Sequence, residues 1–238
     1  MRWAGAFTVI LLACVLSGGC HAGLMVSPVK VEAHDVSVGD EIVLNLAELA
    51  GQEQELHFSL GLFDQDEFGG VVLREDPESQ AWAAKIIELS HSKIILAPYQ
   101  QADIRLTINR ADYASSYIVV FVTPKRSSGV SSRLAVLLLL STEGAAEAIA
   151  LTDVDFTSDK VLITFQNSGS RHGRGEGTLA LYDESGLLLG EEYVDTGTIL
   201  PGCHRRSEIP LHESLSPVYF TFQARELGRQ QYAAEGLW

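Results

Sequence analysis

The side chains of this sequence that could perform catalysis or hold a metal ion are few and widely spaced. The histidines beyond residue 22 are His34, His57, His91, His172, His204 and His212, and none has the spacing of metal ligands. Cys203 precedes His204, but adjacent residues of a strand point to opposite faces, so they make a poor thiolate–imidazole pair. Phosphate-loop, dinucleotide, nucleophile-elbow and zinc-protease motifs are absent from the sequence. We therefore expect a protein that is not an enzyme, with no catalytic residue, no metal site and no cofactor.

One acidic segment has roughly the spacing of a calcium loop. Residues 64–69 read DQDEFG and are followed by Glu75, but Phe68 stands where a ligand is required. The preceding residues 55–63 have a strand pattern instead of the required helix. We expect a polar hairpin tip, and weak calcium binding at Asp64 and Asp66 stays open.

Positive charge is concentrated in two short segments of an otherwise acidic chain. Arg171 and Arg174 lie in one, and Arg205 and Arg206 lie in the other. If the fold brings these segments together, they could bind a carboxylate or an acidic glycan; otherwise they are two solvated loops. The net charge of -14 disfavours nucleic acid as a partner.

The N-terminus has the pattern of an export signal. A short basic start precedes an apolar run over residues 4–16, which is too short to span a bilayer, and small residues follow. We expect a signal peptide over 1–22, or a lipoprotein signal ending at 19 with Cys20 acylated. The protein is then exported to the periplasm or cell surface, with a lipid anchor at Cys20 as its one route to a membrane.

The rest of the chain has the pattern of an all-β protein. Short apolar runs are separated by turn residues every eight to twelve positions. Strands are expected at 25–33, 41–46, 55–63, 85–89, 94–96, 103–108, 117–123, 133–140, 148–156, 160–167, 177–182, 187–190, 208–211 and 218–225. Short helical turns are expected at 79–85 and 46–50. Residues 141–146 read as a linker, which predicts two tandem immunoglobulin-like or fibronectin III-like β-sandwiches over 23–142 and 143–238.

Two late strands of the first half are apolar on both faces. Leu134, Val136, Leu138 and Leu140 alternate with Ala135, Leu137 and Leu139, and residues 117–122 are equally two-sided. In an isolated sandwich one face of each sheet is exposed to solvent. We therefore expect something else to cover the outer apolar face of these two strands. Candidates are a partner to which a strand is donated, the second domain, or a dimer mate. The candidate partner-binding residues are Leu134, Val136, Leu137, Leu138, Leu139, Leu140, Tyr117, Val119 and Phe121.

Several segments resemble bacterial pilus-assembly chaperones. They include residues 24–31 (LMVSPVKV), 94–98 (IILAP) with the alternating 103–108, and 117–120 with 124–126. In the second half, 167–169, 177–179 and 200–202 are similar to a sandwich domain of this group. The resemblance implies two immunoglobulin-like domains set at an angle in the periplasm. It also implies partner binding by strand donation.

Such chaperones anchor a subunit's C-terminal carboxylate with an Arg in the first strand and a Lys in the last strand of domain one. Lys30 and Arg133 are the basic residues nearest these places, and residues 134–140 contain no Lys.

These patterns indicate one of two functions. The first is a non-catalytic, chaperone-like envelope protein that holds an exported β-rich partner, a pilus or surface subunit, by edge-strand addition. The alternative is a surface-tethered adhesive or structural module that contacts glycan or an envelope protein through its basic loops.

Overall fold

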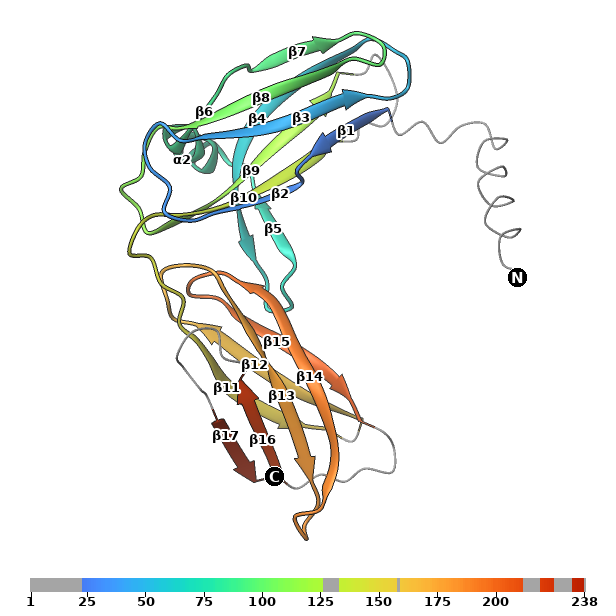
Figure 1. The fold of residues 1–238 in the computed structure, drawn as a ribbon, viewed down its shortest axis with the longest axis vertical. Helices are drawn as coiled ribbons and strands as arrows, with labels where there is room; N and C mark the ends of the chain where they lie inside the picture. Colours follow the sequence, from blue (N-terminus) through green and yellow to red (C-terminus); the bar gives the residue numbers. More distant parts are fainter. Residues whose placement is uncertain (1–22, 126–132, 158, 212–218, 225–232, 238) are drawn as a thin grey trace, which may run out of the picture.

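The computed structural model describes residues 23–125, 133–157, 159–211, 219–224 and 233–237, and it contains two β-sandwiches stacked along the long axis of the molecule (Figure 1). Domain one is the sandwich of β1–β10, and domain two is the sandwich of β11–β17. The expected signal peptide and Cys20 lie outside the described residues. No helix among the described residues is long and apolar enough to cross a membrane.

Domain one has two facing sheets. The first contains β1 (Leu24–Ser27), β3 (Glu41–Glu48), β8 (Gln101–Ile108) and β6 (Ile87–Leu89), in that order. The second contains β2 (Lys30–Ala33), β10 (Leu134–Ser141), β9 (Ser115–Pro124), β4 (Gln54–Gln65) and β5 (Val71–Arg74), and β7 (Lys93–Leu96) also pairs with β4.

The first strand changes sheets midway. Residues 25–33 were expected to form one strand, but a cis Ser27–Pro28 bond separates β1 from β2. β1 pairs antiparallel with β3 in the first sheet, whereas β2 pairs parallel with β10 in the second. Proline has no N–H for a ladder, so the break falls where pairing is lost. The chain thereby joins the two sheets at one side of the sandwich.

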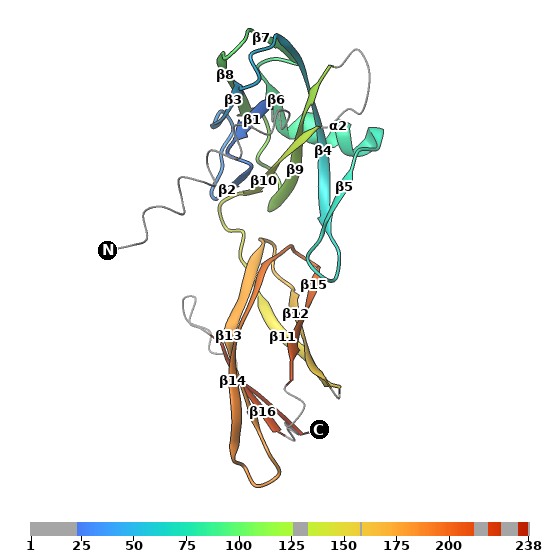
Figure 2. The ribbon, with the colours of Figure 1, turned by 90° about the vertical axis from the view of Figure 1, so that its right-hand side faces the viewer.

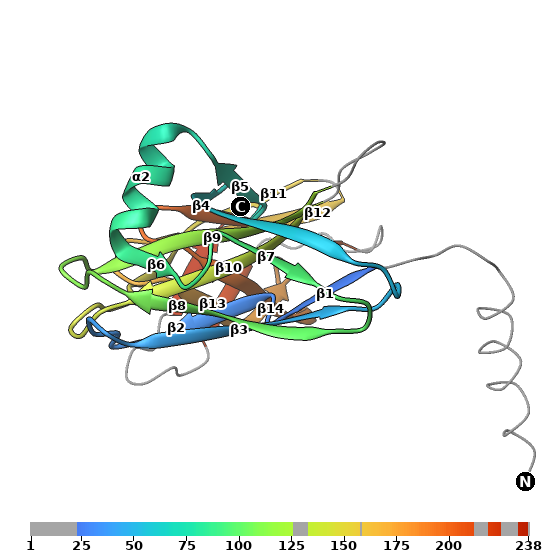
Figure 3. The same ribbon diagram turned by 90° about the horizontal axis from the view of Figure 1, so that it is seen from above.

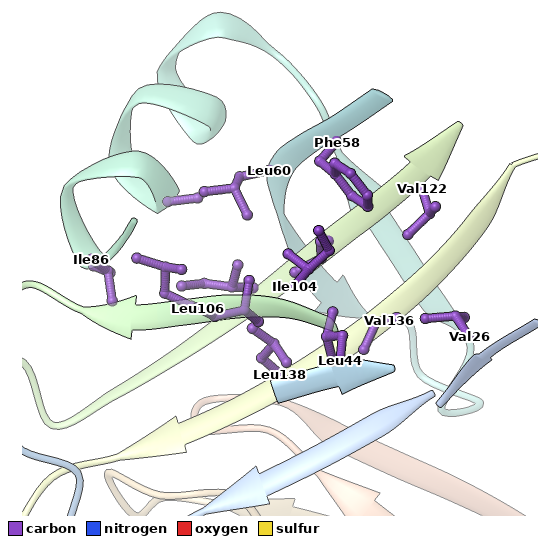
Figure 4. Packing of buried hydrophobic residues seen from close by; sticks show 14 of the residues in the cluster. Val26, Leu44, Phe58, Leu60, Ile86, Ile104, Leu106, Val122, Val136 and Leu138 are labelled. Atoms are coloured by element: carbon purple, nitrogen blue, oxygen red, sulfur yellow. The ribbon is translucent and has the colours of Figure 1, made fainter. Parts of the chain in front are cut away.

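The core of domain one lies between its two sheets (Figure 4). Leu44 and Leu46 of β3 and Ile104 and Leu106 of β8 are fully buried from one side. From the other side come alternate residues of β4, β9 and β10, namely Leu56, Phe58, Leu60, Ile118, Val120, Val122, Val136, Leu138 and Leu140. The period of two in the sequence therefore places one face of each strand in this core.

One helix, α2 (Pro77–Ile86), packs beside β4 and β6 at one edge of domain one (Figure 3). Asp76 caps it by accepting a hydrogen bond from the Ser79 backbone N at 2.9 Å, and Pro77 suits the first helical position. This extends the expected turn at 79–85, and the strand expected at 85–89 begins only at Ile87. The helical turn expected at 46–50 is wrong, because β3 continues to Glu48, whose carboxylate binds the following turn.

Domain two is a smaller sandwich. β11 (Ile149–Phe156), β12 (Lys160–Asn167) and β15 (His204–Pro210) form one sheet. β14 (Leu188–Ile199), β13 (Gly173–Tyr182), β16 (Tyr219–Ala224) and β17 (Ala233–Leu237) form the other. Phe165 and Phe222 meet across the core with ring centroids 5.4 Å apart. The all-β prediction is confirmed, while β5 and β17 were not predicted, and β13 and β15 begin earlier than expected.

Candidate functional site

The two-sided strands β9 and β10 are covered on the inner face and over part of the outer face. Their inner side chains lie in the domain-one core, and their outer side chains form a second apolar cluster. In this outer cluster Val119, Phe121 and Leu139 are no more than 1% exposed, and Tyr117 and Leu137 are partly buried. Domain two supplies Leu200 and Cys203 to the same cluster. The second domain is therefore one of the covers that the sequence required.

A hairpin of domain one also reaches domain two. The β4–β5 hairpin projects toward β15 (Figure 2), and Gln65 lies where it meets domain two. The Gln65 side-chain amide donates to the Thr198 carbonyl at 2.7 Å and accepts from the Leu200 N–H at 3.2 Å. At the tip, the Glu67 carbonyl accepts from the Arg206 N–H at 2.8 Å.

The expected polar hairpin tip is present at residues 66–70. Asp66 Oδ1 accepts hydrogen bonds from the backbone N–H groups of Phe68 and Gly70, at 2.9 and 2.7 Å. Asp64 lies beside Cys203, with Sγ to Oδ1 at 3.7 Å. Burial, and then the Asp64 carboxylate, raise the pKa of the Cys203 thiol, which disfavours a nucleophilic thiolate.

Strand β10 is paired unevenly along its two edges. β9 pairs with all of it, from Leu134 to Ser141. On the other edge β2 pairs only with Leu137–Leu140, and the Leu137 N–H donates to the Val29 carbonyl at 3.0 Å. Backbone groups two residues apart point to the same edge, so the N–H and C=O of Ala135 also point away from β9. Among the described strands, none pairs with that edge over Leu134–Val136.

The side chains along this open stretch differ in exposure. Ala135 is exposed on the outer face, Leu134 and Leu137 are half-buried, and Val136 belongs to the core. Leu138 and Leu140 are also core residues, and Leu139 lies under domain two. Of the expected partner-binding residues, those available to a second protein are therefore Leu134, Leu137 and Tyr117, together with the neighbouring Ala135.

Arg133, just before β10, is held over the outer apolar cluster. Its guanidinium carbon lies 4.1 Å from the ring centroid of Phe121, and its nitrogens form a two-pronged ion pair with Glu75. Hydrogen bonding to Arg133 lowers the pKa of Glu75, so this pair is ionised over most of the pH range. The pair covers the Phe121 ring. Phe121 is opposite Ala135, beyond the stretch of β10 that pairs with β2.

Lys30 lies at the contact between the domains. Its Nζ is 2.5 Å from Glu32 Oε1 and donates to Thr198 Oγ1 at 3.1 Å. Lys30 pairs with Leu137 of β10, and Leu137 is four residues after Arg133 in the chain. The two basic residues expected to act together thus have separate carboxylate partners, Glu32 and Glu75.

Arg174, Arg205 and Arg206 were expected in loops but lie in strands, Arg174 in β13 and the other two in β15, and Arg174 and Arg205 lie near Thr198. Arg174 is opposite Thr198 in the β13–β14 register and pairs with Glu176 and Asp195, at 3.4 and 3.6 Å. Arg205 donates to the Thr198 carbonyl at 3.3 Å and packs against Gly69, where a Cβ would collide with its guanidinium. Arg206 has a buried Nε, and the Arg171 N–H donates to Ala146.

Three side chains that are far apart in the sequence form a cluster with metal-ligand chemistry. Glu32, His34 and His172 each place a potential ligand atom within 4.8 Å of the others. His34 and His172 are 138 positions apart, so their spacing predicted no metal site, and the contact between domains brings them together. The spacing of the histidines in the sequence gave no sign of this cluster.

Among the comparisons with known proteins, solved structures alone give matches. Searches with protein-family models and among curated proteins find no match to the chain. Among solved structures it is similar to the class 5 fimbriae chaperone CfaA, with a TM-score of 0.56 and 14% identity over 90% of this chain and 98% of that one.

Two further similar structures come from complexes. A chaperone–tip adhesin complex of CFA/I fimbriae biogenesis gives a TM-score of 0.55 and 13% identity, covering 91% of this chain and 98% of that one. The CsuC–CsuE chaperone–tip subunit pre-assembly complex from Csu pili of Acinetobacter baumannii gives 0.51 and 12%, covering 90% and 98%. The two-domain fold of fimbrial chaperones, expected from the sequence, is thus confirmed.

Proposed function

We propose that this protein is a non-catalytic, chaperone-like envelope protein that holds an exported β-rich partner by adding a strand edge to it. The observation that carries the proposal is the open edge of β10 at Leu134–Val136, where no described strand pairs on the side away from β9. Unpaired edges are templates for a further strand, and proteins usually block them. This edge lies on a strand whose outer face also presents Ala135 and Leu137.

The edge has the two features that strand addition requires. The backbone N–H and C=O of Ala135 would pair with an incoming strand, and the outward side chains of Ala135 and Leu137 would enter a groove in the partner. β2 begins to pair at Leu137, so an incoming strand would occupy the stretch that β2 leaves free. The affinity would come from main-chain hydrogen bonds and the specificity from the outward side chains.

The fold supports a particular class of partner. Two of the similar structures are described as complexes of a chaperone with a tip subunit. A pilus or surface subunit in the periplasm or at the cell surface is therefore the partner we infer. Lys30 and Arg133 already bind Glu32 and Glu75, so the proposal rests on the strand edge and not on a two-cation carboxylate anchor.

The experiment compares Ala135→Pro with Ala135→Ser in the tagged protein, purified from its native envelope fraction. Proline removes the N–H that faces the open edge, whereas serine keeps it and changes the side chain little. We expect the wild type and Ala135→Ser to retain one exported β-rich protein in stoichiometric amount, and Ala135→Pro to lose it. Circular dichroism of the purified variants establishes that both remain folded.

A photocrosslinking residue provides the second readout. Placed at position 135, it should form an adduct with the retained protein, whereas the exposed Tyr193 position of domain two should not. A folded Ala135→Pro variant that retains its partner would rule out this edge. If the wild type retains no protein, the surface-module function takes its place.

A further inference from the structure

The cluster of Glu32, His34 and His172 joins the two domains. Glu32 belongs to β2 and His34 follows its last residue, so both come from domain one. His172 immediately precedes β13 and comes from domain two. Their potential ligand atoms all lie within 4.8 Å of one another. The imidazoles of His34 and His172 are stacked, with centroids 5.4 Å apart and planes 26° apart.

His172 carries the independent sign of a ligand. Its residue is 6% exposed, and its Nδ1 is buried without a hydrogen-bond partner. A buried nitrogen without a partner is costly, and such exceptions in a folded protein call for a specific explanation.

The surrounding residues hold both imidazoles in place. The His172 backbone N–H donates to the Tyr117 hydroxyl at 2.9 Å, and the two rings meet edge to face at 5.9 Å. His34 Nδ1 is 2.9 Å from the hydroxyl of Ser141, which is 1% exposed. This contact leaves Nε2 of His34 available and orients its ring, as the outer partners of metal-bound histidines do.

The charges around the cluster restrict the kind of ion. Glu32 supplies one carboxylate, and Lys30 already contacts its Oε1 at 2.5 Å. That contact uses Oε1 of the carboxylate, which leaves Oε2 for a ligand role. A hard cation such as Ca²⁺ or Mg²⁺ needs several oxygen ligands, whereas two imidazoles and a carboxylate suit zinc and similar ions.

We propose that Glu32, His34 and His172 form a site for Zn²⁺ or a similar borderline divalent ion, with water as the fourth ligand, that ties domain one to domain two. Ligand atoms of tetrahedral zinc lie about 3.4 Å apart, given Zn–N distances of roughly 2.0–2.1 Å. The three side chains must therefore approach by no more than about 1.4 Å, which side-chain rotation or a small movement between the domains would supply.

The experiment titrates Zn²⁺ into the metal-free, tag-free full chain by isothermal calorimetry, with Ca²⁺ and Mg²⁺ in parallel. We expect one equivalent of Zn²⁺ to bind, a higher Tm with Zn²⁺, and no comparable binding of Ca²⁺ or Mg²⁺. Co²⁺ in place of Zn²⁺ should give the visible absorption of a tetrahedral site.

The matched variants are His34→Gln and the control His91→Ala, both at exposed positions, and circular dichroism establishes that both remain folded. Loss of a residue that only hydrogen-bonds a metal ligand weakens metal binding by ~10- to 100-fold. We expect His34→Gln, which removes a ligand itself, to weaken Zn²⁺ binding by at least as much. His91→Ala should bind like the wild type. Absence of Zn²⁺ binding to the wild type, or binding unchanged in His34→Gln, would overturn the proposal. Because the readout is metal binding, its outcome is independent of partner capture.

Discussion

At the residue scale, Asn167 is a buried polar residue of domain two whose side-chain amide makes four hydrogen bonds. Its Nδ2 donates to the carbonyls of Arg171 and Ile199, at 2.8 and 2.9 Å. Its Oδ1 accepts from the N–H groups of Gly169 and Ala148, at 2.9 and 3.3 Å. The side chain is fully buried, so one amide satisfies four backbone groups of three different loops and strands.

We predict that Asn167→Ala lowers the free energy of unfolding by about 2–4 kcal/mol, because it leaves buried backbone groups without partners. The exposed Asn109→Ala provides the control and should change the free energy by no more than about 0.5 kcal/mol. Urea denaturation followed by circular dichroism measures both. A loss for Asn167→Ala as small as that of the control would mean that water replaces the amide.

At the element scale, β10 has a different role on each face and each edge. Its inner residues fill the domain-one core, Leu139 on its outer face contacts domain two, and its free edge at Ala135 is the proposed partner site. We predict that Leu138→Ala lowers the stability of domain one by about 2–5 kcal/mol, as expected for a leucine truncated in a core. Ala135→Ser on the same strand should cost no more than about 0.5 kcal/mol.

Denaturation curves of these two variants measure the difference. Equal effects at positions 135 and 138 would contradict the register of β10 against β9. The register matters for function, because a shift by one residue would place Leu138 outside and Ala135 inside.

The alternation in β10 shows what the sequence could predict. The period of two assigned Leu134, Val136, Leu138 and Leu140 to one face, and they all contribute to the domain-one core. The same reasoning failed at residues 25–33, because the local pattern is that of one strand and only the pairing partners reveal two. Short β5 was missed, since its four residues are all exposed and so carry no alternation of buried and exposed positions, although they form a hairpin with the end of β4.

At the scale of the whole molecule, the domains meet through residues far apart in the chain. Gln65 binds Thr198 and Leu200, and Lys30 binds Thr198, across separations of more than 130 positions. No local pattern specifies such pairs, and for this reason His34 and His172 could not be recognised as neighbours from their spacing. The sequence did indicate that the outer face of β9 and β10 needed a cover, because alternate positions on both faces are apolar.

Domain two covers Leu139 on the outer face of β10. Leu139 is 1% exposed and lies in one cluster with Leu200, so Leu139→Asp would place a carboxylate in an apolar contact. We expect this variant to separate the domains, seen as a larger radius of gyration by small-angle X-ray scattering, with the β-rich circular dichroism retained. Ala135→Asp, on the same face but exposed, should scatter like the wild type.

The same pair of variants separates domain contact from partner capture. Ala135→Asp places a charge at the open edge, and we expect it to impair capture while the domains stay together. Leu139→Asp should alter the arrangement of the domains and weaken the proposed Zn²⁺ site, because His172 would move away from Glu32 and His34. If Leu139→Asp leaves the scattering unchanged, the polar contacts of Gln65 and Lys30 are sufficient to hold the domains, and the apolar cluster stabilises them only slightly.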